Sequence, residues 1–300
     1  MTPHDHLSWV LNSPNLIRQQ SAPFPVAEPP STNEINALAQ LNKDLLPSHL
    51  AKTKSHFLGS YFESLWQFYL MHSNRYDLIA SNLQFHSQGK TFGELDFLAY
   101  DHQRDIAIHQ EVAIKFYLGS MDKKLGSRWI GPNAIDRLDL KVAHLRDKQL
   151  PLAKHPIVLK KLESLGIKSL KSEALVKGYL FQPAAQTKVA MPNYINPKHL
   201  SGSWYRFHEL REHLSDKQHQ RTSWLKIEKG DWISSDQTFL MHSNQALSLN
   251  RMTNFLDDMN NQNRAHMFAA LIATKDQLTV GEKVFVVPNN WPATHSPPAL

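Results

Sequence analysis

The chain has 300 residues, 41% hydrophobic and 20% charged, which indicates a globular protein of one or two domains. The absence of cysteine excludes disulfides, thiolate zinc sites and cysteine nucleophiles, and the longest apolar runs, such as Met267–Ala273, fall far short of a transmembrane helix of ~20 residues. The net charge of +6 is uneven, because residues 115–230 carry 22 lysines and arginines against 10 acids, whereas the remainder carries 11 against 17. This basic segment is either a polyanion-binding surface or a solvated lysine surface.

Residues 1–50 are predicted to form an N-terminal extension of helical and linker character. The start of the chain lacks the basic residues and long apolar run of a secretory signal, so we expect a cytoplasmic protein without membrane partners. A short helix is predicted over Leu7–Ile17. Ser21–Thr32 is rich in proline and small residues, which is typical of an extended linker.

A largely buried helix is predicted over Ser55–His72. Its hydrophobic side chains recur every three to four residues, at Leu58, Phe62, Leu65 and Tyr69. Glu63 lies inside this apolar stretch, where an unpaired carboxylate would be costly. We therefore expect Glu63 to share a metal site, to accept a hydrogen bond from a neighbour, or to lie on an exposed seam of the helix.

Three strands are predicted next, at Leu83–His86, Phe92–Tyr100 and Ile106–Leu118. Asp101–Arg104 supplies a turn between the last two strands, so these two should form an antiparallel hairpin.

A helix from Pro132 to about Lys148 follows, because proline is favoured in the first turn of a helix. Its predicted apolar face contains Ile135, Leu138, Val142 and Leu145. Arg137, Lys141 and Lys148 are predicted to share a separate basic face that contacts a nucleic-acid backbone.

The remaining pattern predicts an α/β fold in which a central mixed sheet is flanked by helices, with further α+β elements at the C-terminus. A core over residues 51–183 and an elaboration over 184–300, packed on the core and fraying from about residue 288, are expected. The elements behind this prediction are a helix at Ile157–Leu165, a strand at Ala174–Phe181, an irregular stretch at Pro183–Pro197, a helix near Leu247–Asn260 and strands near Met267–Ala273 and Lys283–Val287.

The predicted hairpin contains the residues with the clearest chemistry. Residues two apart on a strand share a face, so Glu94 and Asp96 should lie together on one strand, and Glu111 and Lys115 on the other. Three clustered carboxylates repel one another, and a divalent cation with oxygen ligands would relieve the repulsion. The structural alternative is a set of cross-strand ion pairs on an exposed sheet, each contributing ~0.2–1 kcal/mol.

Several blocks of the sequence resemble the uncharacterised bacterial family called domain of unknown function 1853, and more broadly the PD-(D/E)XK nuclease superfamily. The resemblance is carried by Leu58-Gly-Ser-Tyr-Phe-Glu63, Gly93-Glu-Leu-Asp-Phe-Leu98, Glu111-Val-Ala-Ile-Lys-Phe-Tyr-Leu118, Gly131-Pro-Asn-Ala-Ile-Asp-Arg-Leu-Asp-Leu-Lys141, Ser172-Glu-Ala-Leu-Val-Lys-Gly-Tyr-Leu180 and Phe285-Val-Val-Pro288. It spans most of the chain and implies a restriction-endonuclease-like core.

The resemblance to the nucleases also implies roles for single residues. Asp96 matches the motif aspartate that binds metal, Lys115 the motif lysine, and Glu63 the helix glutamate that completes the metal site in many members. The usual acid two residues before the lysine is replaced by Ala113. Glu111 then stands as a migrated catalytic acid and ligand, assisted by Glu94, or else cleavage has been lost.

Two functions are therefore expected from the sequence. The first is a nuclease that uses Mg²⁺ or Mn²⁺ at Asp96, Glu111, Glu94 and Glu63, with Lys115 in catalysis and DNA favoured over RNA as substrate. The second is a catalytically degenerate nucleic-acid-binding or assembly module with the same fold. Aromatic residues among basic ones are read either as base-stacking groups or as core: Trp204, Tyr205, Phe207, Trp224 and Trp232.

Overall fold

The computed structural model describes residues 2–52, 57–87, 89–122, 126–215, 222–259, 264–275 and 277–292. Its α-helices are α1 (Pro3–Asn12), α2 (Thr32–Ala39), α3 (Leu45–Leu50), α4 (Leu58–His72), α5 (Leu138–His144), α6 (Pro156–Ser164), α7 (Phe207–Leu214), α8 (Asp236–Met241) and α9 (Leu249–Met259). Its strands are β1 (Tyr76–Ser87), β2 (Lys90–Asp101), β3 (Ile106–Asp122), β4 (Gly126–Ile130), β5 (Leu170–Pro183), β6 (Leu200–Arg206), β7 (Thr222–Ile227), β8 (His266–Ala273) and β9 (Leu278–Val287).

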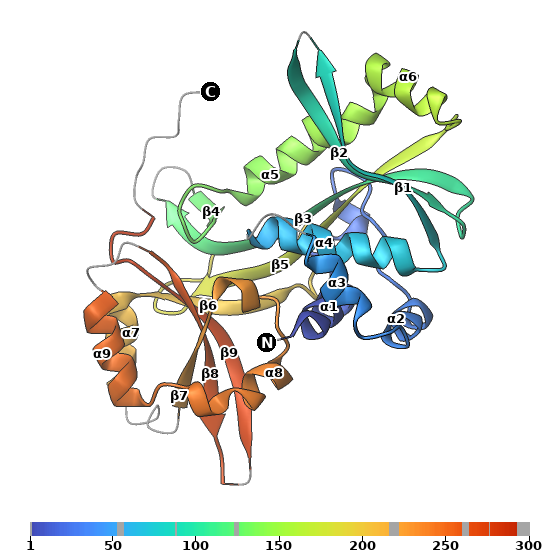
Figure 1. The fold of residues 1–300 in the computed structure, drawn as a ribbon. Helices are drawn as coiled ribbons and strands as arrows, with labels where there is room; N and C mark the ends of the chain where they lie inside the picture. The colour runs from blue at the N-terminus through green and yellow to red at the C-terminus, as the bar shows by residue number, and fades with distance from the viewer. Residues whose placement is uncertain are drawn as a thin grey trace.

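Within these described residues, all the strands belong to one mixed sheet of nine strands (Figure 1). Eight of them follow the order β1-β2-β3-β5-β6-β9-β8-β7, and β4 pairs with β3. The middle of the sheet is parallel, from β3 through β5 and β6 to β9, and both ends are antiparallel. The expected central mixed sheet flanked by helices is confirmed, and so is the antiparallel pairing of β2 with β3.

The two faces of β3 pack against different parts of the chain. Val112 and Phe116 contribute to a core with Phe62 of α4 and with residues of α1. Ala113 and Tyr117 face the opposite core, which contains residues of α5 and of the N-terminal extension. In Figure 1 the helices α1–α4 accordingly lie on one side of this part of the sheet, with α5 on the other. This alternation fixes which side chains of β3 face α5.

Helix α4 forms as its apolar spacing predicts. Phe62, Leu65 and Trp66 are each completely buried, and the indole Nε1 of Trp66 donates a hydrogen bond of 2.9 Å to Gln110 of β3. Since α4 packs across β3, any side chain on the flank of α4 nearest β2 and β3 lies beside the hairpin. Glu63 occupies this flank.

Two helices differ in position from the prediction. Helix α1 begins at Pro3 instead of Leu7, since Thr2 caps its N-terminus and proline is suited to its first turn. The predicted helix at Pro132 begins six residues later, at Leu138. Residues 131–134 form a turn in which Ala134 has a φ of +60° and its N–H bonds the carbonyl of Gly131.

The helical run that starts at α5 continues beyond the predicted end. A π-helical turn, η2 (Leu145–Gln149), follows α5 directly, and a 3₁₀ segment, η3 (Leu150–Lys154), follows η2. Of the predicted apolar face, Leu138, Val142 and Leu145 are buried, whereas Ile135 precedes the helix and is 76% exposed. The π-helical turn matters for the site because it sets the direction of Gln149.

The proline-rich stretch near residue 25 is extended, as predicted, but it is packed into the protein. The backbone of Ala174 in β5 exchanges hydrogen bonds with Pro25 and Ala27, and Phe24 and Val26 are buried beside β5. The stretch 184–199 between β5 and β6 is irregular, as expected. The last part of the predicted fraying tail, residues 293–300, lies outside the described residues. No helix in the described part of the chain is long and apolar enough to cross a membrane.

Candidate active site

The hairpin opens into a fork, and the candidate site lies in that fork. Strands β2 and β3 pair only from Asp101↔Ile106 to Phe97↔Gln110, after which β2 continues beside β1 alone. Beyond this point the N–H of Val112 no longer has a β2 backbone partner. The carboxylate of Asp96 accepts its hydrogen bond instead, at 2.9 Å through Oδ2. Because the pairing of β2 with β3 ends at Phe97, the N–H of Val112 binds the Asp96 side chain and fixes its orientation.

The environment of Asp96 opposes its ionisation. Burial, together with the nearby carboxylates of Glu111 and Glu63, raises the pKa of Asp96 to about 8, even though the Val112 N–H and Lys141 favour the charged form. A carboxyl group with such a pKa is found preferentially at functional sites, although structural networks can also produce it. The folded protein therefore disfavours the charged form of Asp96, which lies where β2 and β3 separate.

Glu63 is the second acid of this cluster. It is half-buried on α4, and its pKa is raised by burial and by the charges of Glu94 and Glu111. Glu94 lies two residues before Asp96 on β2 and accepts a hydrogen bond of 2.8 Å from Gln84 of β1. The charges of the hairpin acids therefore act on the carboxyl group of Glu63.

Glu111 differs from the other acids because both of its oxygens are bonded. It is 1% exposed, Oε1 lies 2.8 Å from Nε2 of His109, and Oε2 accepts a hydrogen bond from Gln149 of η2. The other ring nitrogen of His109 lies 3.1 Å from the hydroxyl of Ser172. Glu111 is thus held in a buried chain of polar groups behind Asp96.

Lys115 lies on the same face of β3 and is held by an acid that the sequence analysis did not identify. Its ammonium group pairs with Oδ2 of Asp136, which comes from the loop before α5, and Oδ1 of Asp136 accepts a hydrogen bond of 3.3 Å from Tyr117. Strand β5 comes very close at this point. Gly178 has a φ of +137°, and a Cβ there would lie 1.7 Å from the carbonyl oxygen of Lys115.

Lys141 points into the carboxylate cluster and does not share a basic face with Arg137 and Lys148. Its Nζ donates a hydrogen bond of 2.8 Å to Gln149, and its pKa is lowered by burial and by Lys115. The prediction of one basic helical face is wrong because α5 begins only after Arg137. Arg137 pairs with Asp139, and Lys148 is exposed in η2.

Ala113, at the position where the resemblance expects an acid, has an apolar environment. Its side chain is 8% exposed and belongs to the core that contains Tyr117, Leu138 and Val142. A carboxylate at this position would need to be buried among these side chains. The packing of α5 therefore explains why an alanine fits here.

A cavity of about 750 Å³ opens beside the acids. Its lining includes Glu94 and Asp96 on one side and residues of η2, η3 and the start of α6 on the other, Lys148 and Lys154 among them. Gly93 allows this close approach, because a Cβ there would lie 2.5 Å from the side chain of Leu152. The cavity gives a ligand access to Asp96 past two cationic side chains.

Whether the fork can hold a divalent cation depends on the carboxylate oxygens that it brings together. Within the described residues, no group of three or more histidine, aspartate or glutamate side chains has an arrangement that could hold a metal ion. Asp96 nevertheless lines the cavity, and the charge of Glu63 acts on its carboxyl group. Mg²⁺ is usually held by one or two carboxylates, with waters and substrate phosphates as its other ligands. The donor set suits such a site.

Most of the proposed base-stacking residues are core. The rings of Trp204, Tyr205, Phe207 and Trp224 are buried at 6% exposure or less. Trp232 is half-buried and borders a separate pocket.

Three polar neighbours of the acids were not predicted from the sequence, and Lys141 was predicted on a different surface. The two-residue alternation of the strand indicates His109 as a neighbour of Glu111. Asp136 comes from a loop and Gln149 from a π-helical turn, and no periodic pattern points to either. The position of Lys141 became clear only when the start of α5 was known.

Comparisons with known proteins identify the family of the chain. No curated protein matches it, and no solved structure does. The family model described as "Domain of unknown function (DUF1853)" matches residues 5–287. Because this match spans nearly the whole chain, the protein belongs to the DUF1853 family.

Proposed function

We propose that the protein is a metal-dependent nuclease of the PD-(D/E)XK type that hydrolyses phosphodiester bonds, in DNA rather than RNA. The proposal depends above all on the fork between β2 and β3, where the charges of Glu63, Glu111 and Lys141 act on Asp96. Lys115 follows Glu111 on β3, and its charge acts on Lys141. The motif resemblance of the sequence supports it independently. An acid with a pKa near 8 that faces a cavity is an expected feature of a site that binds a cation.

Asp96 and Glu63 would hold Mg²⁺ or Mn²⁺, with waters and a substrate phosphate as its other ligands. The bound ion would lower the pKa of water and neutralise charge on the scissile phosphate. Glu111 would act on the site through its charge, because both of its oxygens are already bonded to His109 and Gln149.

Lys115 acts on the substrate through its ammonium group. Its partner Asp136 holds the ammonium group, and the close contact between β3 and β5 at Gly178 fixes its backbone. The ammonium group orients the attacking water and stabilises negative charge as it develops on the phosphate oxygens. Lys141 compensates the acids before the substrate arrives, since its charge is attracted to Asp96 and Glu111.

A cleavage assay tests this function directly. Purified protein is incubated with supercoiled plasmid and with single-stranded RNA, in Mg²⁺, in Mn²⁺ and in chelator. We expect metal-dependent nicking of DNA that is lost in Asp96→Asn and Lys115→Met. The matched controls Asp44→Asn and Lys160→Met change exposed residues of the same types outside the fork and should retain activity. Activity that persists in Asp96→Asn would refute the proposal.

A second function is favoured by two observations at the fork. Ala113 replaces the usual acid, and Glu111 is fully hydrogen-bonded inside the protein. Both features fit a nucleic-acid-binding or assembly module that has lost catalysis. This function predicts salt-sensitive binding that needs no divalent metal and is retained in Asp96→Asn. The plasmid assay combined with a filter-binding assay separates the two functions.

A further inference from the structure

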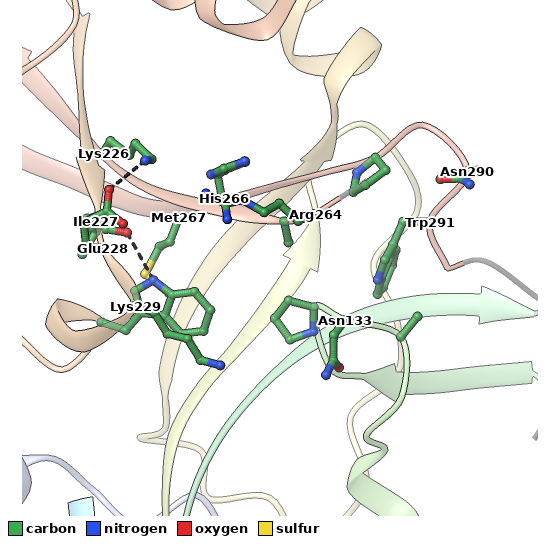
Figure 2. Close-up of a pocket in the computed structure, with 15 residues that line it drawn as sticks. Asn133, Lys226, Ile227, Glu228, Lys229, Arg264, His266, Met267, Asn290 and Trp291 are labelled. Atoms are coloured by element: carbon green, nitrogen blue, oxygen red, sulfur yellow. Dashed lines mark hydrogen bonds and ion pairs between the residues drawn. The ribbon is translucent and has the colours of Figure 1, made fainter. Parts of the chain in front are cut away.

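A second pocket, of about 350 Å³, lies in the C-terminal half of the molecule. It is formed by the loop after β4, by the end of β7 with the residues that follow, and by the start of β8 with the segment after β9. Figure 2 shows Lys226 and Glu228 at one side of this view and Asn290 and Trp291 at the other, with His266 and Arg264 between them. Its volume lies within the range of small-molecule sites.

The lining of the pocket is positively charged. Lys226, Lys229 and Arg264 line it against a single carboxylate, Glu228, which pairs with Lys226 at 2.7 Å. Lys229 and Arg264 are exposed at their side chains, so both can reach a ligand from solvent. An anionic ligand would complement this excess of positive charge.

Two indole rings form apolar walls. Trp232 makes edge contacts with Phe116 and Phe285, with ring centres 5.0 Å and 4.9 Å apart. Trp291 packs on Trp204, with ring centres 4.8 Å apart. The ammonium group of Lys229 lies 6.0 Å from the ring centre of Trp232. Rigid aromatic walls beside cations suit a flat ring that carries an anionic group.

The walls also have hydrogen-bonding capacity that is not used. Nε2 of His266 and Nε1 of Trp291 are buried and have no partner among the described residues. His266 is uncharged at neutral pH, because burial and the charges of Lys226 and Arg264 lower its pKa to about 4. Its ring therefore offers one donor and one acceptor, and buried polar atoms of this kind usually have partners.

We propose that this pocket binds a nucleotide. Lys229 and Arg264 bind the phosphate, the base lies against Trp232, and Nε2 of His266 and Nε1 of Trp291 bond its polar edge. The proposal concerns binding alone and does not depend on cleavage at the fork. A nucleotide satisfies the charge, the flat walls and the unused nitrogens at once, whereas phosphate or a neutral ring satisfies only part of them.

Isothermal titration calorimetry in chelator tests the proposal. AMP, GMP, CMP and UMP are titrated separately, with adenosine and inorganic phosphate as partial ligands. We expect at least one nucleotide to bind at least roughly tenfold more tightly than either partial ligand. The proposal is overturned if no nucleotide binds, or if inorganic phosphate binds as tightly as the best nucleotide.

Variants locate the binding in this pocket. Lys229→Ala and Arg264→Ala should each weaken nucleotide binding roughly tenfold, because each removes one charged phosphate contact. Lys160→Ala removes an exposed lysine from α6 and should leave binding unchanged. Circular dichroism confirms that each variant is folded. Equal affinities in wild type and in the Lys229→Ala/Arg264→Ala double variant would refute this site.

The same titration distinguishes a free nucleotide from the end of a strand. A short oligonucleotide with a 5′-phosphate is compared with its unphosphorylated form, and each is competed with the best mononucleotide. Competition only by the phosphorylated strand indicates a strand end as the ligand, and no competition by either strand indicates a free nucleotide. Because chelator stops metal-dependent cleavage, loss of nuclease activity and loss of nucleotide binding are observed separately.

Discussion

Two aspartates on strand β2 lie five residues apart and have opposite environments. Asp101 is completely buried and accepts hydrogen bonds from Arg75 at 2.8 Å and from Arg104, and these two guanidinium groups hold its pKa below the ordinary value. Asp96 accepts one backbone hydrogen bond and is surrounded mainly by other acids, and its pKa is raised to about 8. The same residue type on the same strand therefore has its pKa shifted in opposite directions.

The difference lies in the partners that the fold provides. Arg104 also binds Glu173, whose other contact is Gln110, so the closed end of the hairpin is a fully paired polar network. At the open end, Glu63 and Glu111 face Asp96, and their compensation by Lys141 is incomplete. The paired end stabilises the fold, whereas the charged forms of the acids at the open end are disfavoured, as a cation site would require.

The largest effect is expected from Asp101→Asn. This change leaves Arg75 and Arg104 without their shared carboxylate in a buried setting, which should destabilise the fold by about 3–5 kcal/mol. Urea denaturation followed by circular dichroism measures the change. A loss below about 1 kcal/mol would show that the network contributes little, as many exposed ion pairs do.

Gly178→Ala should have the next largest effect. The φ of +137° and the contact with the Lys115 carbonyl leave no room for a Cβ, so we expect β3 and β5 to separate locally and the fold to lose about 3 kcal/mol. Gly230→Ala is the matched control, because nothing lies within 4 Å of a Cβ there. Thermal unfolding of both variants should show a lower midpoint only for Gly178→Ala.

Asp96→Asn should raise stability, in contrast to Asp101→Asn. The pKa of Asp96 is raised from its ordinary value of 3.8 to about 8 in the folded protein. Between pH 3.8 and about pH 8, the folded state therefore keeps a proton that the unfolded chain releases. The free energy of unfolding of the wild type should therefore fall by about 1.4 kcal/mol per pH unit through this interval, and Asp96→Asn should lack this contribution.

Urea denaturation between pH 5 and pH 8 measures that slope in both proteins. The two stability curves should separate as the pH rises, with Asp96→Asn the more stable at pH 8. The pKa of Asp101 is lowered, so its contribution is present above its unfolded value and is lost only in more acidic solution. Parallel curves for wild type and Asp96→Asn would mean that folding does not raise the pKa of Asp96.

The smallest effect is expected on the affinity for DNA. Lys148→Ala and Lys154→Ala each remove one cation from the cavity beside Asp96. Each change should weaken DNA binding by about 1 kcal/mol and lower the salt slope by about one counterion. Fluorescence anisotropy at several salt concentrations checks both quantities. An unchanged slope would place the DNA elsewhere on the protein.

Much of the hairpin could be predicted from the sequence, because its chemistry follows the alternation of strands. A period of two places Glu111 and Lys115 on one face, and a turn at 101–104 brings Asp96 opposite them. The regular apolar spacing of α4 likewise predicted a buried helix that carries Glu63, whereas its place near the hairpin acids was implied only by the resemblance to the nucleases. These predictions depend only on local periodicity, which the packed structure preserves.

The remaining features depend on contacts that no periodic pattern encodes. Pro132 suggested the start of a helix, but the left-handed Ala134 closes a turn there and α5 begins at Leu138. Because α5 begins later than predicted, Lys141 does not lie on the predicted basic face and instead lies near the acids Asp96 and Glu111. Strand β6 has serine and glycine at its centre, and only its neighbours β5 and β9 make it a strand.

Binding of Mn²⁺ followed by electron paramagnetic resonance tests the central claim most directly. The unpaired carboxylates at the fork should bind the ion in the wild type, and binding should weaken at least roughly tenfold in Asp96→Asn. The control Asp44→Asn should bind as the wild type does. Equal binding in wild type and Asp96→Asn, or no binding in either, would contradict a metal site at the fork.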